Sequence, residues 1–188
     1  MSWLVVLLGY LIGSIPTGYL AGRLLRGKDI RQMGDGNMGA QNVFRQLGAR
    51  VGIAVGLFDG AKGALIILIA RAVHVPDVSM YLAGAAAVIG HNWPVFLGFR
   101  GGRGEATTLG ILLALMPLPT AIMLVPGLAV VAVTRNVTLG SVVGFVPLPL
   151  VALWLHTPGP YIIYALGLLV LVALTHLFRV RRIVTRQA

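Results

Sequence analysis

The segment Thr107–Val133 reads TTLGILLALMPLPTAIMLVPGLAVVAV, an uncharged apolar run that contains Pro117, Pro119 and Pro126. A membrane-spanning helix needs roughly 20 residues, so this run is too long for a single crossing. Proline lacks a backbone donor and kinks or ends a helix. We therefore expect two short tilted segments with a turn near Met116–Pro119. A re-entrant hairpin would return the chain to the same side of the membrane.

Other apolar runs flank this segment, and each is long enough to cross a membrane once. They are Trp3–Leu25, Val51–Ala70, Val78–Phe99, Val137–Leu155 and Tyr161–Phe178. The chain is 57% hydrophobic with a mean hydropathy of +0.90, which is more apolar surface than one soluble core can hide. The sequence predicts an all-α integral membrane protein, a compact bundle of about seven transmembrane helices forming a single domain over residues 1–188. The apolar N-terminus, which has no basic region, is expected to remain as the first span.

Basic residues fall between the apolar runs and predict the orientation of the chain. Lysine and arginine favour cytoplasmic loops, so an N-terminus outside the cell places nearly all of them, and the C-terminus, in the cytoplasm. This set comprises Arg23, Arg26, Lys28, Arg31, Arg45, Arg50, Arg100, Arg103, Arg135, Arg179, Arg181, Arg182 and Arg186. The formal net charge of +10 is not gathered on a soluble face, so anionic lipids and an anionic substrate are expected as partners, and nucleic acid is not.

Several kinds of chemistry have no signature in this chain. There is no cysteine, which excludes disulfides and thiolate catalysis, and Asp and Glu together number only 5. No His-x-x-x-x-Asp, zinc-binding HExxH or phosphate-binding Walker motif occurs. We therefore expect no metal and no cofactor.

The first candidate for a substrate site is the glycine-rich basic segment Arg31–Arg50. Glycine permits close backbone approach, while amides and arginine can hold phosphate oxygens. Its candidate phosphate ligands are Asn37, Gly39, Asn42 and Arg45. A short interfacial helix is expected over Asn42–Leu47. The alternative is a flexible loop whose arginines bind lipid head groups.

The second candidate is Arg100–Glu105, which reads RGGRGE and follows an apolar run. Arg100 and Arg103 can bind an anion, and the amides of Gly101 and Gly102 can complete a backbone cradle. His91 lies nearby in the sequence, where a helix-end histidine bonded to a carbonyl is the plainer interpretation.

Five further polar residues, which lie in three segments, have roles that the sequence leaves open. Asp59 and Lys62 lie within an apolar run at i, i+3 spacing, where pairing with each other is the plainer expectation and a substrate role for Lys62 the sharper one. Thr138 and Ser141 can cap a helix or bind phosphate. His176 lies near the cytoplasmic end of the last run.

Together these segments resemble the bacterial acyl-phosphate:glycerol-3-phosphate acyltransferase family. The matching positions run in order along almost the whole chain: Gly13–Tyr19, Asp29–Arg31, Gly36–Ala40, Asn42–Val43, Arg45, Leu47–Gly48, Asp59, Lys62–Gly63, Gly90–His91, Pro94, Phe96–Leu97, Phe99, Gly101–Gly102, Gly104, Ala106–Thr107, Thr134–Arg135, Leu139–Ser141 and His176. Each match is weak alone, but the ordered set is specific.

The resemblance implies a seven-span enzyme of the bacterial inner membrane with its site on the cytoplasmic side. Such enzymes move an acyl group from acyl phosphate, not from acyl-CoA or acyl carrier protein, to the 1-hydroxyl of glycerol 3-phosphate, giving lysophosphatidic acid and phosphate. This is the first step of phospholipid synthesis. The resemblance also implies that no metal is needed and that substrate phosphate replaces a protein base. It implies catalytic roles for Ser141, Arg103 and His176, and leaves the oligomeric state open.

The chain departs from the family pattern at several motif positions. Asp35 replaces a usual serine, Gln41 a threonine, Arg100 and Arg103 lysines, Glu105 an apolar residue, Thr138 a serine and Arg179 an asparagine. We expect Asp35, Gln41, His91 and Glu105 to modulate the site. Asp35 can repel substrate phosphate, or pair with Arg31, Arg45 or Arg103. A divergent acyltransferase with another acceptor or donor, and a non-catalytic lipid-binding or transport protein, remain as alternatives.

Overall fold

The computed structural model describes residues 2–187, and the side chains of residues 2–178, as helices joined by short loops. The α-helices are α1 (Ser2–Gly13), α2 (Thr17–Arg26), α3 (Ala40–Leu47), α4 (Ala49–Ala72), α5 (Asp77–Asn92), α6 (Glu105–Leu115), α7 (Pro117–Thr134), α8 (Val137–Phe145), α9 (Leu148–Trp154) and α10 (Gly159–Gln187); the 3₁₀ helices are η1 (Ile30–Gln32) and η2 (Val95–Leu97). No strand occurs in this part of the chain. The all-α prediction is confirmed.

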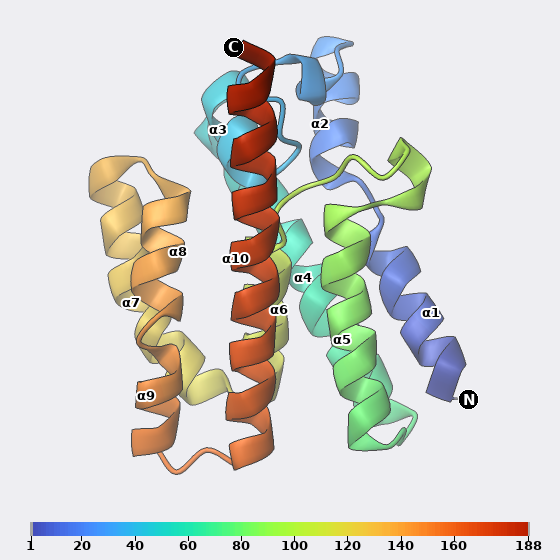
Figure 1. Ribbon diagram of the computed structural model, residues 1–188, viewed down its shortest axis with the longest axis vertical. Helices are drawn as coiled ribbons and strands as arrows, with labels where there is room; N and C mark the ends of the chain where they lie inside the picture. Colours follow the sequence, from blue (N-terminus) through green and yellow to red (C-terminus); the bar gives the residue numbers. More distant parts are fainter. Residues whose placement is uncertain (1, 188) are drawn as a thin grey trace.

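The long helices stand side by side as one bundle, with the two chain ends at opposite ends of it (Figure 1). By length and composition, 5 helical stretches in the described chain can cross a membrane: Ser2–Arg26, Ala49–Ala72, Pro117–Thr134, Val137–Trp154 and Gly159–Phe178. Helix α5 has 16 residues and α6 has 11, and both lie within the bundle. The membrane bundle is therefore established, while the count of seven crossings stays a prediction.

Proline sets most of the breaks in these helices. The predicted turn in Thr107–Val133 is confirmed, since α6 ends at Leu115 and α7 begins at Pro117. Similar breaks separate α1 from α2 beside Pro16 and α8 from α9 at Pro147, and these were not predicted. The expected run Val78–Phe99 is longer than the helix found there, because α5 spans Asp77–Asn92.

Helix α5 ends at Asn92 because the chain turns away before Pro94, which cannot continue the helical hydrogen-bond ladder. The residues after it form η2 and the glycine-rich loop. This loop and the segment between α2 and α4 lie toward the same end of the bundle (Figure 1).

Glycines let the central helices approach closely. A Cβ at Gly9 or Gly13 of α1 would collide with the backbone of α5, and one at Gly63 of α4 or Gly110 of α6 would collide with the backbone of the facing helix. Small residues at helix contacts are typical of membrane bundles. Outward-facing apolar side chains such as Leu57 and Val125 are exposed, as a lipid-facing surface requires.

Candidate active site

The segment between α2 and α3 is held in shape by a buried asparagine. The Asn42 side-chain amide donates to the carbonyl oxygens of Ile30, Met33 and Asn37 at 3.2, 2.9 and 2.7 Å. Asn42 is 1% exposed. Since its donor group is used within the loop, Asn42 shapes this segment, and a direct bond from Asn42 to phosphate stays a prediction. The expected short helix is confirmed as α3, which begins two positions earlier at Ala40.

Arg31 joins this segment to the loop that follows α5. Its guanidinium bonds both carboxylate oxygens of Asp29, at 2.7 Å from Nη2 to Oδ2, and donates from Nη1 to the carbonyl oxygen of Leu97 at 3.0 Å. These bonds hold the pKa of Asp29 below its ordinary value and raise that of Arg31. Asp29 also accepts from the backbone N–H of Arg31, which caps η1. Arg31 is therefore a structural residue and is not the partner of Asp35.

The glycine-rich loop packs back onto the end of α5. The backbone N–H groups of Gly101 and Gly102 donate to the carbonyl oxygens of Asn92 and His91 at 3.1 and 2.9 Å. A Cβ at Gly102 would collide with the His91 ring. These two amides are thus engaged within the protein, and the anion cradle expected of them stays a prediction. The glycines serve close packing, and this packing directs the next residue, Arg103, inward.

The two arginines of this loop have different environments. Arg100 is exposed and does not line the pocket, whereas the Arg103 side chain is 13% exposed and does. The Nη2 atom of Arg103 lies 3.7 Å from Oδ2 of Asp35. Its Nε is buried, with no hydrogen-bond partner among the described residues. Arg103 is therefore a mostly buried cation at this site with bonding capacity left for an anion.

A pocket opens beside Arg103, between the first loop, α4, the end of α5, the start of α6 and the start of α8. Its walls are Asn37, Gly39, Ala40, Gln41, Asp59, His91, Arg103, Gly104, Glu105, Ala106 and Val137. Helix α6 begins at Glu105, two residues after Arg103, so the positive end of its dipole adds to the arginine charge.

An ionic cluster lies behind the pocket. Asp59 and Lys62 pair at 2.8 Å and are almost fully buried, which confirms the predicted i, i+3 pair. The Asp59 carboxylate also accepts from the Thr17 hydroxyl at 2.5 Å and lies 3.4 Å from Nδ1 of His91. Lys62 donates to the carbonyl oxygen of Ile15 at the break between α1 and α2. With these bonds the pair joins α2, α4, α5 and the break before α2, and it holds His91, which packs against Gly102.

Glu105 brings two of the predicted catalytic side chains together. The Ser141 hydroxyl of α8 donates to Oε2 of Glu105 at 2.7 Å, and Nδ1 of His176 on α10 lies 3.8 Å from Oε1. Nearby, the Thr138 hydroxyl donates to Oε1 of Gln41 at 3.1 Å. The departures at Gln41 and Thr138 thus contact each other, as do those at Asp35 and Arg103.

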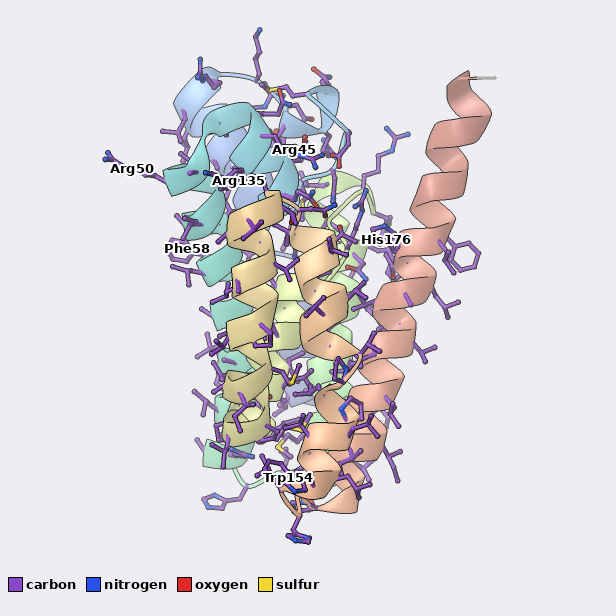
Figure 2. All side chains as sticks on the ribbon, turned by 90° about the vertical axis from the view of Figure 1, so that its left-hand side faces the viewer. Arg45, Arg50, Phe58, Arg135, Trp154 and His176 are labelled. Carbon is purple, nitrogen blue, oxygen red and sulfur yellow. The ribbon has the colours of Figure 1, made fainter. Side chains whose placement is uncertain are left out.

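The remaining predicted phosphate ligands are Arg45, Asn37 and Gly39. Arg45 is exposed on α3, at the end of the bundle where Arg135 and His176 also lie, while Trp154 lies at the opposite end (Figure 2). Asn37 and Gly39 line the pocket. The side chain of Arg179 lies outside the described residues.

Two polar contacts were missed by sequence reasoning. Thr17 bonds Asp59, and Asn92 donates from its side chain to the Thr175 hydroxyl at 3.1 Å, joining α5 to α10. A polar residue inside an apolar run was the available signal in each case, since such residues usually face the bundle interior.

Known proteins are similar to this chain in sequence and in fold. Residues 3–186 match the family model described as glycerol-3-phosphate acyltransferase. Glycerol-3-phosphate acyltransferase 4 of Dehalococcoides mccartyi is 49% identical over 182 residues, which cover 97% of this chain and 98% of the relative. The glycerol-3-phosphate acyltransferase of Synechococcus sp. is 42% identical over 185 residues, covering 97% of this chain and 91% of the relative.

The fold is also similar to crystal structures of PlsY, an integral membrane glycerol 3-phosphate acyltransferase. The glycerol 3-phosphate form gives a TM-score of 0.85 at 32% identity, covering 98% of this chain and 92% of that one. The lysophosphatidic acid form gives a TM-score of 0.83 at 31% identity with the same coverage. The chain belongs to the glycerol-3-phosphate acyltransferase family.

Proposed function

We propose that this protein transfers an acyl group from acyl phosphate to the 1-hydroxyl of glycerol 3-phosphate, releasing lysophosphatidic acid and inorganic phosphate. Family membership and the similarity to PlsY in its glycerol 3-phosphate and lysophosphatidic acid forms support the acceptor and the product. The observation that carries the proposal is the position of Arg103, a buried cation beside a pocket to which distant segments of the chain contribute.

Phosphate binding is assigned to the cationic side of the pocket. Arg103 offers guanidinium donors, and the α6 N-terminus adds the positive end of its dipole. Asn37 and Gly39 line the same pocket and can complete the ligand set, while Arg45 and Arg100 lie outside its walls and attract anions from solution.

Acyl transfer at this site depends mainly on placing two anionic molecules side by side. Holding both in one pocket makes a bimolecular step effectively intramolecular, which lowers the barrier. Acyl phosphate is a suitable donor because its leaving group is phosphate, which needs little general-acid help and fits a cationic site. His176 and Ser141 are assigned to the reacting end, where they approach Glu105. A reaction without metal or cofactor stays a prediction.

The site is assigned to the cytoplasmic face of a bacterial plasma membrane, with the N-terminus outside. Arg45 and Arg135 lie at the same end of the bundle (Figure 2), and the positive-inside rule assigns this end to the cytoplasm. The outward-facing apolar side chains between the two ends are suited to contact with lipid tails.

The test is an acyl-transfer assay with the purified protein in lipid nanodiscs. With acyl phosphate and glycerol 3-phosphate we expect lysophosphatidic acid and phosphate in equal amounts, and none when acyl-CoA or acyl carrier protein replaces the donor. Glycerol serves as a control acceptor that lacks phosphate. Transfer to glycerol as fast as to glycerol 3-phosphate, or no transfer from acyl phosphate, would refute the proposal.

A further inference from the structure

The hydrogen bond between Ser141 and Glu105 changes what this serine can do. A hydroxyl has one hydrogen and two lone pairs. In this chain that hydrogen points to Oε2 of Glu105 at 2.7 Å. Ser141 can then accept a hydrogen bond from a ligand but has no hydrogen left to donate. The pair therefore suits an acceptor's hydroxyl group better than a phosphate oxygen, which needs a donor.

One carboxylate oxygen of Glu105 bonds Ser141, and the other lies near a second polar side chain. Arg103 precedes it in the pocket wall, and Nδ1 of His176 on α10 lies 3.8 Å from Oε1. Asp59, the other acid of the pocket wall, is paired with Lys62 of α4 and lies beside His91 of α5. Helices α7 and α8 contribute no ionisable side chain. Asp59 is thus paired with a buried lysine, whereas the neighbours of Glu105 are the Ser141 hydroxyl and the His176 ring.

From this geometry we infer that Glu105 accepts the proton of the acceptor hydroxyl, through Ser141. As the glycerol 1-hydroxyl oxygen attacks the acyl carbonyl carbon, its proton passes to the Ser141 oxygen, and the serine's own proton passes to Glu105. The carbonyl-to-phosphate C–O bond breaks, and the phosphate leaves with the bonding electron pair. Glu105 then returns the proton to the phosphate, which restores the carboxylate.

This assignment rests on the proposed function and adds a step to it. The family resemblance implies that substrate phosphate takes the proton, with an apolar residue at this position. Here a carboxylate occupies that place at hydrogen-bond distance from Ser141. The reaction in this chain therefore uses a protein group for proton uptake and depends less on the protonation of its substrate.

The first experiment compares Glu105→Gln and Glu105→Ala with the wild type in the nanodisc assay. Proton transfer by a positioned group contributes about 10²- to 10⁴-fold, so we expect kcat to fall about 100-fold or more while KM for glycerol 3-phosphate changes little. Added formate should restore kcat in Glu105→Ala, where it can occupy the vacated space, and not in the isosteric Glu105→Gln. Asp77→Asn, which removes an exposed carboxylate from the far end of α5, is the matched control and should leave kcat unchanged.

The second experiment is a double-mutant cycle with Ser141→Ala. If the proton travels through Ser141, Glu105→Gln should lower kcat far less in the Ser141→Ala background than in the wild type. Full kcat in Glu105→Gln, fully additive effects, or formate rescue of neither variant would each overturn the assignment while wild-type transfer stands. An inactive wild type would instead overturn the proposed function, and this step with it.

Discussion

Among single side chains, Arg103 and Arg100 differ in a way that activity measurements can detect. Both arginines occupy motif positions of the family in one loop. Only Arg103 lines the pocket, and its buried Nε lacks a partner among the described residues. A hydrogen bond to a charged group contributes about 1.5–3 kcal/mol, so Arg103→Ala should lower kcat/KM about 10- to 100-fold. Arg100→Ala should have a much smaller effect. Equal losses in the two variants would contradict the pocket assignment.

Asp35 competes with substrate for Arg103. Its Oδ2 lies 3.7 Å from the guanidinium, and its Oδ1 accepts from the backbone N–H of Asn37 at 3.0 Å. Asp35→Asn keeps an oxygen for Asn37 and removes the charge, so we expect KM for glycerol 3-phosphate to fall by roughly tenfold or less. Asp35→Ser should lower KM in the same direction. A loss of kcat in both variants would instead place Asp35 in the chemistry.

The Asp29–Arg31 pair makes stability depend on pH at the acidic end. Because Arg31 lowers the pKa of Asp29 in the folded protein, the pair stabilises the fold above the ordinary carboxyl pKa and loses this contribution as pH falls through the lowered value. Asp29→Asn keeps the cap of η1 without the charge. We expect its melting temperature to lie about 2–4 °C below wild type at pH 7, and the difference to shrink only as pH falls below 3.8, the ordinary carboxyl pKa. A difference independent of pH would show that the charge is not responsible.

Among helix pairs, the contact of α4 with α6 has the greatest consequence for the site, because α6 begins at Glu105. A Cβ on Gly63 would collide with the carbonyl oxygen of Thr107, whereas one on Gly167 of α10 meets nothing within 4 Å. Gly63→Ala should therefore lower the free energy of unfolding by about 1–3 kcal/mol, and the melting temperature with it. It should also reduce activity. The chemically identical Gly167→Ala is the control and should match wild type. Thermal unfolding in detergent and the transfer assay measure both effects.

Helix breaks were predictable where proline clusters, and contacts were predictable where they are local. Pro117 and Pro119 located the turn between α6 and α7, and i, i+3 spacing located the Asp59–Lys62 pair. The bonds of the Gly101 and Gly102 amides were not predictable, because their partners, the last carbonyls of α5, are fixed by how the loop folds back.

The Ser141–Glu105 bond was equally hidden from the sequence, because 36 positions separate the two residues and only the packing of α8 beside α6 brings them together. Thus the chain's apolar runs predicted the bundle, and its motifs predicted the candidate residues. Which of those residues keep free donors depends on tertiary contacts that no local pattern encodes.

For the bundle as a whole, the one-sided arrangement of the basic loops is the property on which a shared pocket depends. Arg50 and Trp154 are exposed and lie at opposite ends of the molecule (Figure 2). The chain contains no cysteine, so single-cysteine variants report one position each. In sealed inside-out vesicles an impermeant maleimide should label Arg50→Cys and not Trp154→Cys, and in right-side-out vesicles the reverse. Labelling of both variants from one side would contradict the opposite placement of the two ends. Labelling of Arg50→Cys in right-side-out vesicles would place the arginine-rich loops outside the cell and contradict a cytoplasmic phosphate pocket.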